Sequence, residues 1–201
     1  MGEIDAIDII REVVNIGIGE AASSLSELVK DRVYINVPDI QIMDLIDVPA
    51  YIKSEMEALG ILISQDFHGL IDGKVLLTYS RECSISLVNS LYGITKDIAS
   101  LTNSDIATLQ EVGNIIIVSC ISAISNIIEG RLNFTIPQVT MGISSEYFQD
   151  LMKDLEEFEK CIIIKNRITI KGNDIRGYIF ILLTFRAFEL VTEKLGKGVK
   201  F

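Results

Sequence analysis

Two copies of a Glu–Asn pair are the residues of this chain whose types and spacing best suit chemistry. In each copy the Asn follows the Glu by three positions, and a proline follows the Asn by 23 positions. The second copy begins 99 residues after the first in a chain of 201 residues. The two sets are Glu12, Asn15 and Pro38, and Glu111, Asn114 and Pro137. Because the chain has only three prolines, two in one register indicate a site that is used twice.

The chemistry of such a pair is positioning. A spacing of three residues on a helix puts the carboxylate and the amide side by side. An amide is not a strong base, but its acceptor oxygen and two donors can orient a water molecule. The neighbouring carboxylate can bind a cation on a partner protein. The pair therefore suits phosphoryl transfer, in which catalysis is mostly positioning and electrostatics and the partner can supply the metal.

Long helices are expected to carry both pairs. Apolar residues recur at helical spacing over residues 4–30 and again over residues 104–129. The opposite face of the first helix carries a polar stripe of Asp8, Glu12, Asn15 and Gly19. A glycine in mid-helix costs about 1 kcal/mol relative to alanine. For Gly17 and Gly19 we therefore expect a close contact, either with a partner's backbone beside the stripe or with another helix.

The remaining elements are expected in the same order in both halves. In the first half we predict strands at 32–37, 60–67 and 74–79 and helices at 52–58 and 84–92. Pro38 is expected to end the first strand, Asp72-Gly73 to form the hairpin turn, and Gly93 to end the last helix. In the second half we predict strands at 132–136, 161–170 and 178–185 and helices at 146–159 and 187–195, with Pro137 ending the first strand and Gly130 and Gly196 as helix stops.

This order predicts an α+β fold with a mostly antiparallel sheet and the long motif helices packed on it. We expect one domain over residues 1–201, made of two repeats at about 1–98 and 99–201 that are related by a pseudo-twofold axis.

The composition excludes several classes of partner and location. A net charge of −10 and a pI near 4.6 oppose binding to nucleic acid or anionic lipid, so protein partners are expected. No apolar run reaches the roughly 18 residues that span a bilayer, and the richest stretch, 115–128, predicts a buried helix. Three widely spaced cysteines (Cys83, Cys120 and Cys161) and an acidic N-terminus are typical of free thiols in a cytoplasmic protein without membrane insertion.

Other candidate sites have simpler interpretations. His68 is the only histidine, which leaves no zinc site and no local signature of a nucleophile, so we expect a surface or turn residue. Residues 17–22 fit the G-x-G-x-x-A dinucleotide pattern, but they fall inside a helix whose N–H groups are already bonded. The acidic run from Asp150 to Glu159 is expected to be a solvated helix face.

The doubled motif resembles the CheC/CheX/FliY group of chemotaxis phosphatases. Residues 8–38, with the run Glu-Val-Val-Asn-Ile-Gly-Ile-Gly-Glu-Ala-Ala from Glu12, look very like the first CheC signature. The run Glu-Val-Gly-Asn-Ile from Glu111, with Pro137, looks like the second. Because both motifs are present and no flagellar switch domain follows them, the chain is most similar to stand-alone CheC.

The resemblance implies hydrolysis of the aspartyl phosphate on a CheY-like response regulator in chemotaxis. It implies that Asn15 and Asn114 orient the attacking water and that Glu12 and Glu111 pair with a lysine of the regulator. The regulator would bring its own Mg²⁺, so no cofactor is expected in this chain. Family members also bind the receptor deamidase CheD, which stimulates the phosphatase. Supporting roles at the partner contact are expected for Asp8, Gly19, Pro38 and Pro137.

The second motif departs from the first at three positions. Ala107 stands where the first motif has Asp8, and Ile116 and Val118 stand where it has Gly17 and Gly19. The bulkier pair would restrict approach at the second site or serve a different packing role, so equal activity of the two sites is not implied. The alternative hypotheses are a non-catalytic adaptor that sequesters CheD or the phosphorylated regulator, and a structural module whose Glu and Asn have no role.

Overall fold

A seven-stranded sheet separates two layers of helices. The computed structural model describes residues 3–55, 60–93 and 101–198. The first half contributes α1 (Glu3–Val29), β1 (Val33–Asp44), the 3₁₀ turn Leu45–Asp47, α2 (Val48–Glu55), β2 (Ile61–Gly69), β3 (Gly73–Tyr79) and α3 (Arg81–Tyr92). The second half contributes α4 (Asn103–Ile128), β4 (Leu132–Phe134), β5 (Gln138–Met141), α5 (Ser145–Lys153), β6 (Lys160–Ile170), β7 (Asn173–Leu183) and α6 (Phe185–Gly198).

Every pair of neighbouring strands is antiparallel, in the order β1-β6-β7-β3-β2-β4, with β5 continuing the edge beside β2. Each strand that follows a long helix pairs with the hairpin of the other half, because β1 lies on β6 and β4 and β5 lie on β2. The predicted α+β fold with long helices on an antiparallel sheet is therefore confirmed. The division at about residue 98 stays a prediction.

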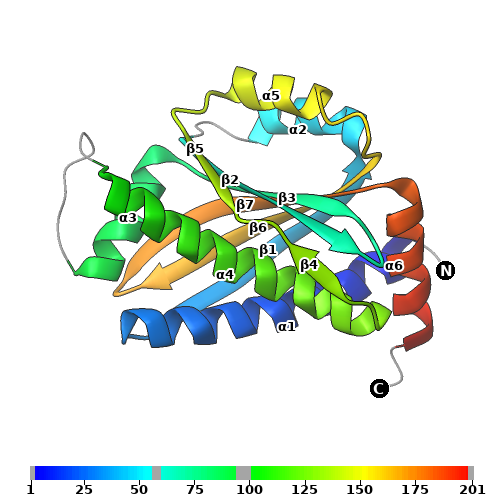
Figure 1. Cartoon of the computed structure of the whole chain (residues 1–201), viewed down its shortest axis with the longest axis horizontal. Helices are drawn as coiled ribbons and strands as arrows, with labels where there is room; N and C mark the ends of the chain where they lie inside the picture. The colour runs from blue at the N-terminus through cyan, green and yellow to red at the C-terminus, as the bar shows by residue number, and fades with distance from the viewer. Residues whose placement is uncertain (1–2, 56–59, 94–100, 199–201) are drawn as a thin grey trace.

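Strand residues alternate between two hydrophobic cores. Ile61, Ile63, Val75 and Leu77 pack under α1, α3, α4 and α6, whereas their neighbours Leu62 and Leu76 pack under α2 and α5. Figure 1 shows these helix layers on opposite sides of the sheet, with α1 and α4 side by side. The period of two in a strand puts successive side chains on opposite faces. A sheet buried on both faces explains why these strands have so few polar residues.

Two glycines lie at the centre of the sheet, where β3 pairs with β7. A Cβ atom on Gly73 would lie 2.7 Å from the carbonyl oxygen of Leu182, and one on Gly177 would lie 2.8 Å from that of Thr78. The offset from Gly73 to Gly177 equals the offset from Thr78 to Leu182. Each half therefore contributes a glycine that faces the same carbonyl of the other half, as a pseudo-twofold axis between β3 and β7 requires.

The prediction that Pro38 ends its strand was wrong, whereas β4 does end before Pro137, at Phe134. Pro38 lies inside β1, where the register against β6 shifts between Asn36 and Asp39. Pro137 lies between β4 and β5, and the register against β2 also shifts there. In both places the proline strand has one residue more than its partner. Both strands are sheet edges, where a proline's missing N–H and a bulge are tolerated.

Several predicted boundaries also differ. The acidic helix α5 ends at Lys153 instead of 159, and the backbone N–H of Glu159 donates to Leu183 instead. Strand β7 starts at Asn173, because Lys171 and Gly172 both have positive φ and close a two-residue turn. Gly73 is already in β3, and Gly196 lies inside α6. Of the helix predicted at 52–58, residues 52–55 lie in α2, which begins earlier, and the rest lie outside the described residues.

Helix α4 is the one helix in the described part of the chain that is long and apolar enough to be compared with a membrane span. Half of its most apolar window is buried inside the molecule. Core helices commonly pass such a test of length and composition. The side chains of Val112, Ile117 and Ile121 lie in the core between the sheet and α1. The prediction of a buried helix over 115–128 is thus confirmed.

Candidate functional site

The two motif helices contact each other closely at Gly17. A Cβ atom at this position would lie 2.7 Å from the carbonyl oxygen of Ser119 and 2.8 Å from the Cα of Cys120 on α4. Helix packing, and not a partner, therefore explains Gly17. Gly19 is different, since a Cβ there would meet nothing within 4 Å. Its cost to helix stability has no explanation within the described structure.

The first Glu–Asn pair lies on an open helix surface. Asp8, Glu12, Asn15 and Gly19 are all exposed, as the stripe predicts. The Oδ1 of Asp8 forms an ion pair with the Arg11 guanidinium nitrogen at 3.1 Å. The side chains of Glu12 and Asn15 have no hydrogen bond or ion pair with any described residue. Pro38 is exposed on the edge strand β1. The pair is thus accessible to a partner, and nothing in the described chain fixes its side chains.

The second pair lies closer to the sheet. Glu111 is exposed, whereas Asn114 is half-buried. The buried Gly113 allows this approach, because a Cβ atom there would lie 2.7 Å from the Cδ1 of Ile63 on β2. The side-chain nitrogen of Gln65, also on β2, donates a 3.0 Å hydrogen bond to the Oδ1 of Asn114. The second amide therefore has a neighbour that the first one lacks.

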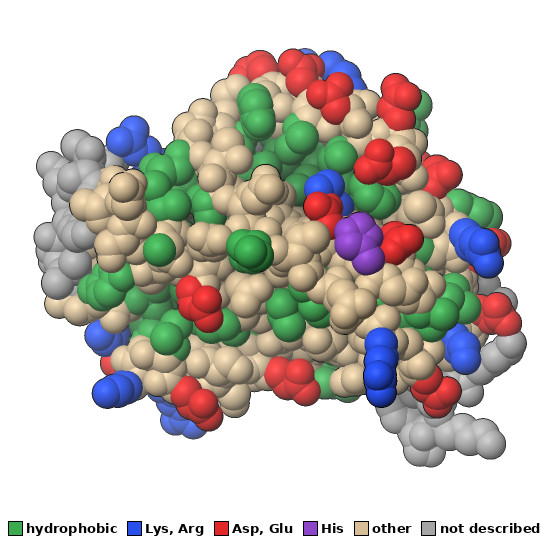
Figure 2. All heavy atoms as spheres, in the orientation of Figure 1, with side chains coloured by type: hydrophobic (Ala, Val, Ile, Leu, Met, Phe, Trp, Pro, Cys, Tyr) green, Lys and Arg blue, Asp and Glu red, His purple; other side chains and the backbone are tan. Residues whose placement is uncertain are grey.

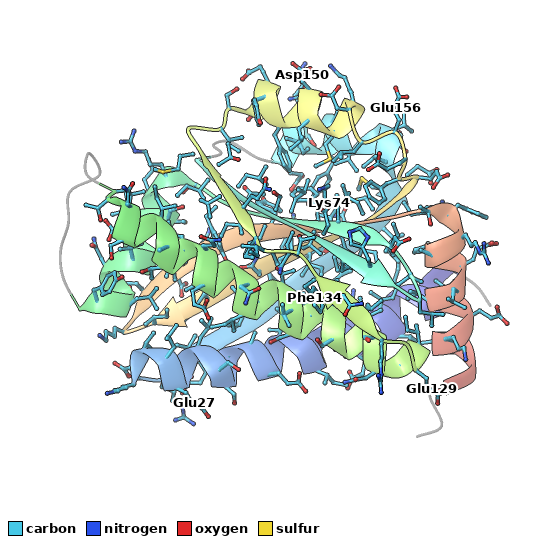
Figure 3. All side chains as sticks on the ribbon, viewed as in Figure 1. Glu27, Lys74, Glu129, Phe134, Asp150 and Glu156 are labelled. Carbon is cyan, nitrogen blue, oxygen red and sulfur yellow. The ribbon has the colours of Figure 1, made fainter. Side chains whose placement is uncertain are left out.

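A cavity of about 390 Å³ opens beside Glu111 and Asn114. The connection between β4 and β5 forms its other wall, including Pro137, whose carbonyl oxygen accepts a 2.7 Å hydrogen bond from Gln110. Phe134, labelled in Figure 3, lines the cavity from the end of β4. Ile136 is 81% exposed beside it. The structure thus brings Glu111, Asn114 and Pro137 together around one hollow.

The departures in the second motif do not close this site. Ala107 lines the cavity, and its small side chain occupies little of the space. Ile116 is only 1% exposed and packs in the core, so it has the packing role and does not restrict approach. Val118 is half-buried. The sequence left two expectations for the bulkier residues, restricted approach or a packing role, and the burial of Ile116 supports the packing role.

Sequence patterns did not single out Gln65, Gln110 or Thr135. Gln65 is 2% exposed within the run Ile-Leu-Ile-Ser-Gln-Asp-Phe of β2. Alternation puts it on the same face as Ile63 and Phe67, which predicts burial. A buried glutamine needs hydrogen-bond partners. That was the available signal, although it does not name the partner.

The other candidates have the simple interpretations that the sequence predicts. His68 is exposed at the end of β2, with its Nδ1 3.4 Å from Asp72, and Figure 2 shows the histidine at the surface in purple. The acidic residues from Asp150 to Glu159 are exposed as predicted, but only Asp150 lies on α5, so the prediction of a helix face was wrong for those after Lys153. The G-x-G-x-x-A segment lies inside α1. Among the described residues, no group of three or more His, Cys, Asp or Glu side chains is arranged to hold a metal.

The three cysteines are free thiols. Cys120 and Cys161 are buried, and Cys83 is partly exposed. Burial raises the pKa of the Cys120 thiol to about 12 and also raises the pKa of Cys161. Neither buried thiol has the thiolate character that a nucleophile needs.

A larger cavity of about 710 Å³ lies elsewhere. It is lined by Arg81 at the start of α3 and by Ser144 and Glu146 at the start of α5. The hydroxyl groups of Ser80 and Ser144 already cap these two helices. None of the predicted site residues lines this cavity, so its size does not make it the candidate site.

Comparison with known proteins agrees with the fold and with the first motif. Residues 6–42 match the model of the CheC-like family, a span that contains Glu12, Asn15 and Pro38. The chain is 21% identical to the CheY-P phosphatase CheC of Bacillus subtilis (strain 168) over 202 residues, covering 97% of this chain and 96% of that protein.

Two solved structures share the fold. FliY of Thermotoga maritima has a TM-score of 0.77 at 16% identity, covering 99% of both chains. The FliM middle domain from H. pylori has a TM-score of 0.64 at 13% identity, covering 96% of this chain and 99% of that one. The chain is thus similar to CheC-like proteins over its first motif and along its length, and it has the fold of FliY and of the FliM middle domain.

Proposed function

We propose that this protein is a phosphatase that hydrolyses the aspartyl phosphate of a CheY-like response regulator. The observation that carries the proposal is the second pair, in which Asn114 lies beside a cavity and its amide is held by Gln65. A held amide can place a water molecule without first losing side-chain freedom. The similarity to a CheY-P phosphatase supports the choice of substrate.

The proposed reaction forms one bond and breaks one. The water oxygen bonds to phosphorus while the bond between phosphorus and the aspartyl oxygen breaks, leaving an aspartate carboxylate and dihydrogen phosphate. Asn15 and Asn114 orient this water in line with the breaking bond. Since phosphoryl transfer depends mainly on position and electrostatics, an amide suffices and no nucleophile is needed in this chain.

The carboxylates are proposed to hold the regulator. Glu12 and Glu111 are exposed and make no ion pair with any described residue, so each is available to a lysine of the partner. The regulator supplies Mg²⁺, and this chain supplies no cofactor. Asp8 and Gly19 lie on the exposed stripe of α1, Pro38 is exposed on β1, and Pro137 lines the second site, so all four are accessible for their proposed roles at the contact.

The proposal also covers the cellular location and a second protein partner. We propose a cytoplasmic protein whose activity is stimulated by CheD. The net charge of −10 favours protein partners over nucleic acid and membranes. The alternative is an adaptor that sequesters CheD or the phosphorylated regulator without turnover. It is favoured by the first site, where the exposed Asn15 has no hydrogen-bond partner among the described residues.

The test measures the decay of a phosphorylated CheY-like regulator with this protein present, without and with CheD. We expect wild-type protein to accelerate decay and the double variant Asn15→Ala, Asn114→Ala to remove the acceleration while regulator binding persists. Asn36→Ala, an exposed asparagine on β1, is the matched control and should keep the activity. Binding without acceleration by the wild-type protein would establish the adaptor instead.

A further inference from the structure

The hydrogen bonds of Gln65 determine which way the Asn114 amide faces. The Gln65 nitrogen donates to the backbone carbonyl of Thr135 at 2.8 Å and to Asn114 Oδ1 at 3.0 Å. A backbone carbonyl can only accept, so the Gln65 amide cannot be reversed without setting its oxygen against the Thr135 carbonyl. Its second N–H must therefore go to Asn114, which must present its oxygen. The Asn114 amide nitrogen is thereby turned away from Gln65.

The carbonyl that starts this chain of hydrogen bonds is itself fixed. The backbone N–H of Thr135 donates to the carbonyl of Asp66 at 3.0 Å, and the N–H of Asp66 donates to the hydroxyl of Thr135 at 3.0 Å. Thr135 is thus fastened twice to the residue next to Gln65. These contacts join β2 to the segment between β4 and β5, which also forms the cavity wall.

Gln65 is retained in the core at a cost. It is 2% exposed, and its side-chain oxygen has no hydrogen-bond partner in the described structure. An unsatisfied buried acceptor costs about 1–3 kcal/mol. An apolar side chain would pack here without that cost. Buried polar groups that remain unpaired require an explanation beyond packing.

The first site lacks this arrangement. Gln65 of β2 lies opposite Val75 of β3, two residues after Gly73. The residue two positions after Gly177 is Ile179 of β7, and it lies opposite Ile164 of β6. The pseudo-twofold position of Gln65 is therefore an isoleucine that cannot donate. In agreement, the side chain of Asn15 is exposed and has no hydrogen-bond partner among the described residues.

We propose that Gln65, oriented by the Thr135 carbonyl, is a positioning residue that fixes the Asn114 amide at the second site. This inference rests on the proposed phosphatase function. Gln65 does not touch the substrate and acts through Asn114. A fixed amide offers the attacking water one remaining lone pair of Oδ1 and two N–H donors in set directions.

The test uses backgrounds in which one site remains. Gln65→Met keeps the side-chain volume but removes both donors. In the Asn15→Ala background, where only the second site works, we expect kcat to fall about two- to tenfold with KM changed less than twofold. In the Asn114→Ala background, where only the first site works, Gln65→Met should leave the remaining rate unchanged. Tm and regulator binding are measured for every variant.

Two controls make the outcomes distinct. Thr78→Val removes a buried, unpaired hydroxyl on β3 and should affect neither background. Gln65→Glu is the second variant if Gln65→Met does not fold, and its carboxylate would accept from the Asn114 nitrogen and turn the amide round. An equal loss in both backgrounds, or no loss in either, overturns the positioning role. A wild-type protein without phosphatase activity overturns the proposed function, which is a separate result.

Discussion

Gly17 of α1 lies so close to Ser119 of α4 that a Cβ atom at position 17 would be 2.7 Å from the Ser119 carbonyl oxygen. Gly19 is two residues away and has free space around its Cα. Both glycines carry the same intrinsic cost in a helix, about 1 kcal/mol relative to alanine. Only Gly17 gains a packing contact in return, so the two positions should respond oppositely to substitution.

We predict that Gly17→Ala destabilises the protein by about 1–3 kcal/mol, because backbone atoms of α4 cannot make room for a methyl group. Gly19→Ala should stabilise it by up to about 1 kcal/mol. Urea unfolding followed by circular dichroism measures both. If a partner's backbone approaches the stripe, Gly19→Ala should also weaken regulator binding. A more stable variant with unchanged binding would remove Gly19 from the partner surface.

The two asparagines are predicted to contribute unequally. Asn114 is held by Gln65 beside the cavity, whereas Asn15 must lose side-chain freedom when a water and a regulator bind. Ordering a free side chain costs about 0.5–1.5 kcal/mol, which corresponds to a factor of roughly 2–10 in rate. Asn114→Ala should therefore lower the single-turnover rate of phosphate release more than Asn15→Ala does. Equal losses would mean that the hydrogen bond from Gln65 has no catalytic consequence.

How far the sequence could be interpreted depends on how local each signal is. Glu12 and Asn15 are exposed on one helix face because helical period is a local property, and Glu111 lies correspondingly on α4. Pro38 was misassigned because a proline at an edge bulge has the same local pattern as a proline that ends a strand. Whether the ladder resumes is decided by the partner strand.

Gln65 could not be placed at the site for the same reason. Its partners Asn114 and Thr135 lie 49 and 70 residues away along the chain. The period of β2 predicts that Gln65 is buried, but only the pairing of β2 with the segment around β4 and β5 brings its partners together. The motif therefore predicted the Glu111–Asn114 pair, whereas Gln65, which orients Asn114, is identified only from the strand pairing.

Thiol labelling should separate the cysteines by burial. Because burial raises the pKa of Cys120 to about 12 and that of Cys161 also, both stay protonated and inaccessible near neutral pH. We predict that iodoacetamide modifies Cys83 in the native protein and leaves the other two intact, as measured by peptide mass spectrometry. All three should react in denaturant. Rapid native labelling at Cys120 would show that α4 opens away from the core.

Lys165 makes the folding stability of the protein fall at alkaline pH. Its Nζ lies 3.0 Å from Glu55 on α2 and 3.6 Å from Asp39 on β1, and the hydrogen bond to Glu55 is the main cause of its raised pKa. A raised pKa adds stability that is complete below the unfolded value of about 10.5 and is lost as pH rises through the folded value. Burial raises the pKa of Tyr51 to about 12, which acts in the same direction.

We predict that Glu55→Gln lowers the free energy of unfolding by less than about 1 kcal/mol near neutral pH, since the pair is partly exposed. The difference from wild type should shrink above about pH 10.5, because the unfolded chain then releases the Lys165 proton while the folded protein, with its raised pKa, still holds it. Urea unfolding from about pH 7 to about pH 11.5 measures this. Tyr51→Phe is the control, because it removes the tyrosine titration and keeps the pair. A difference that stays constant across this range would show that Glu55 stabilises α2 without the charge of Lys165.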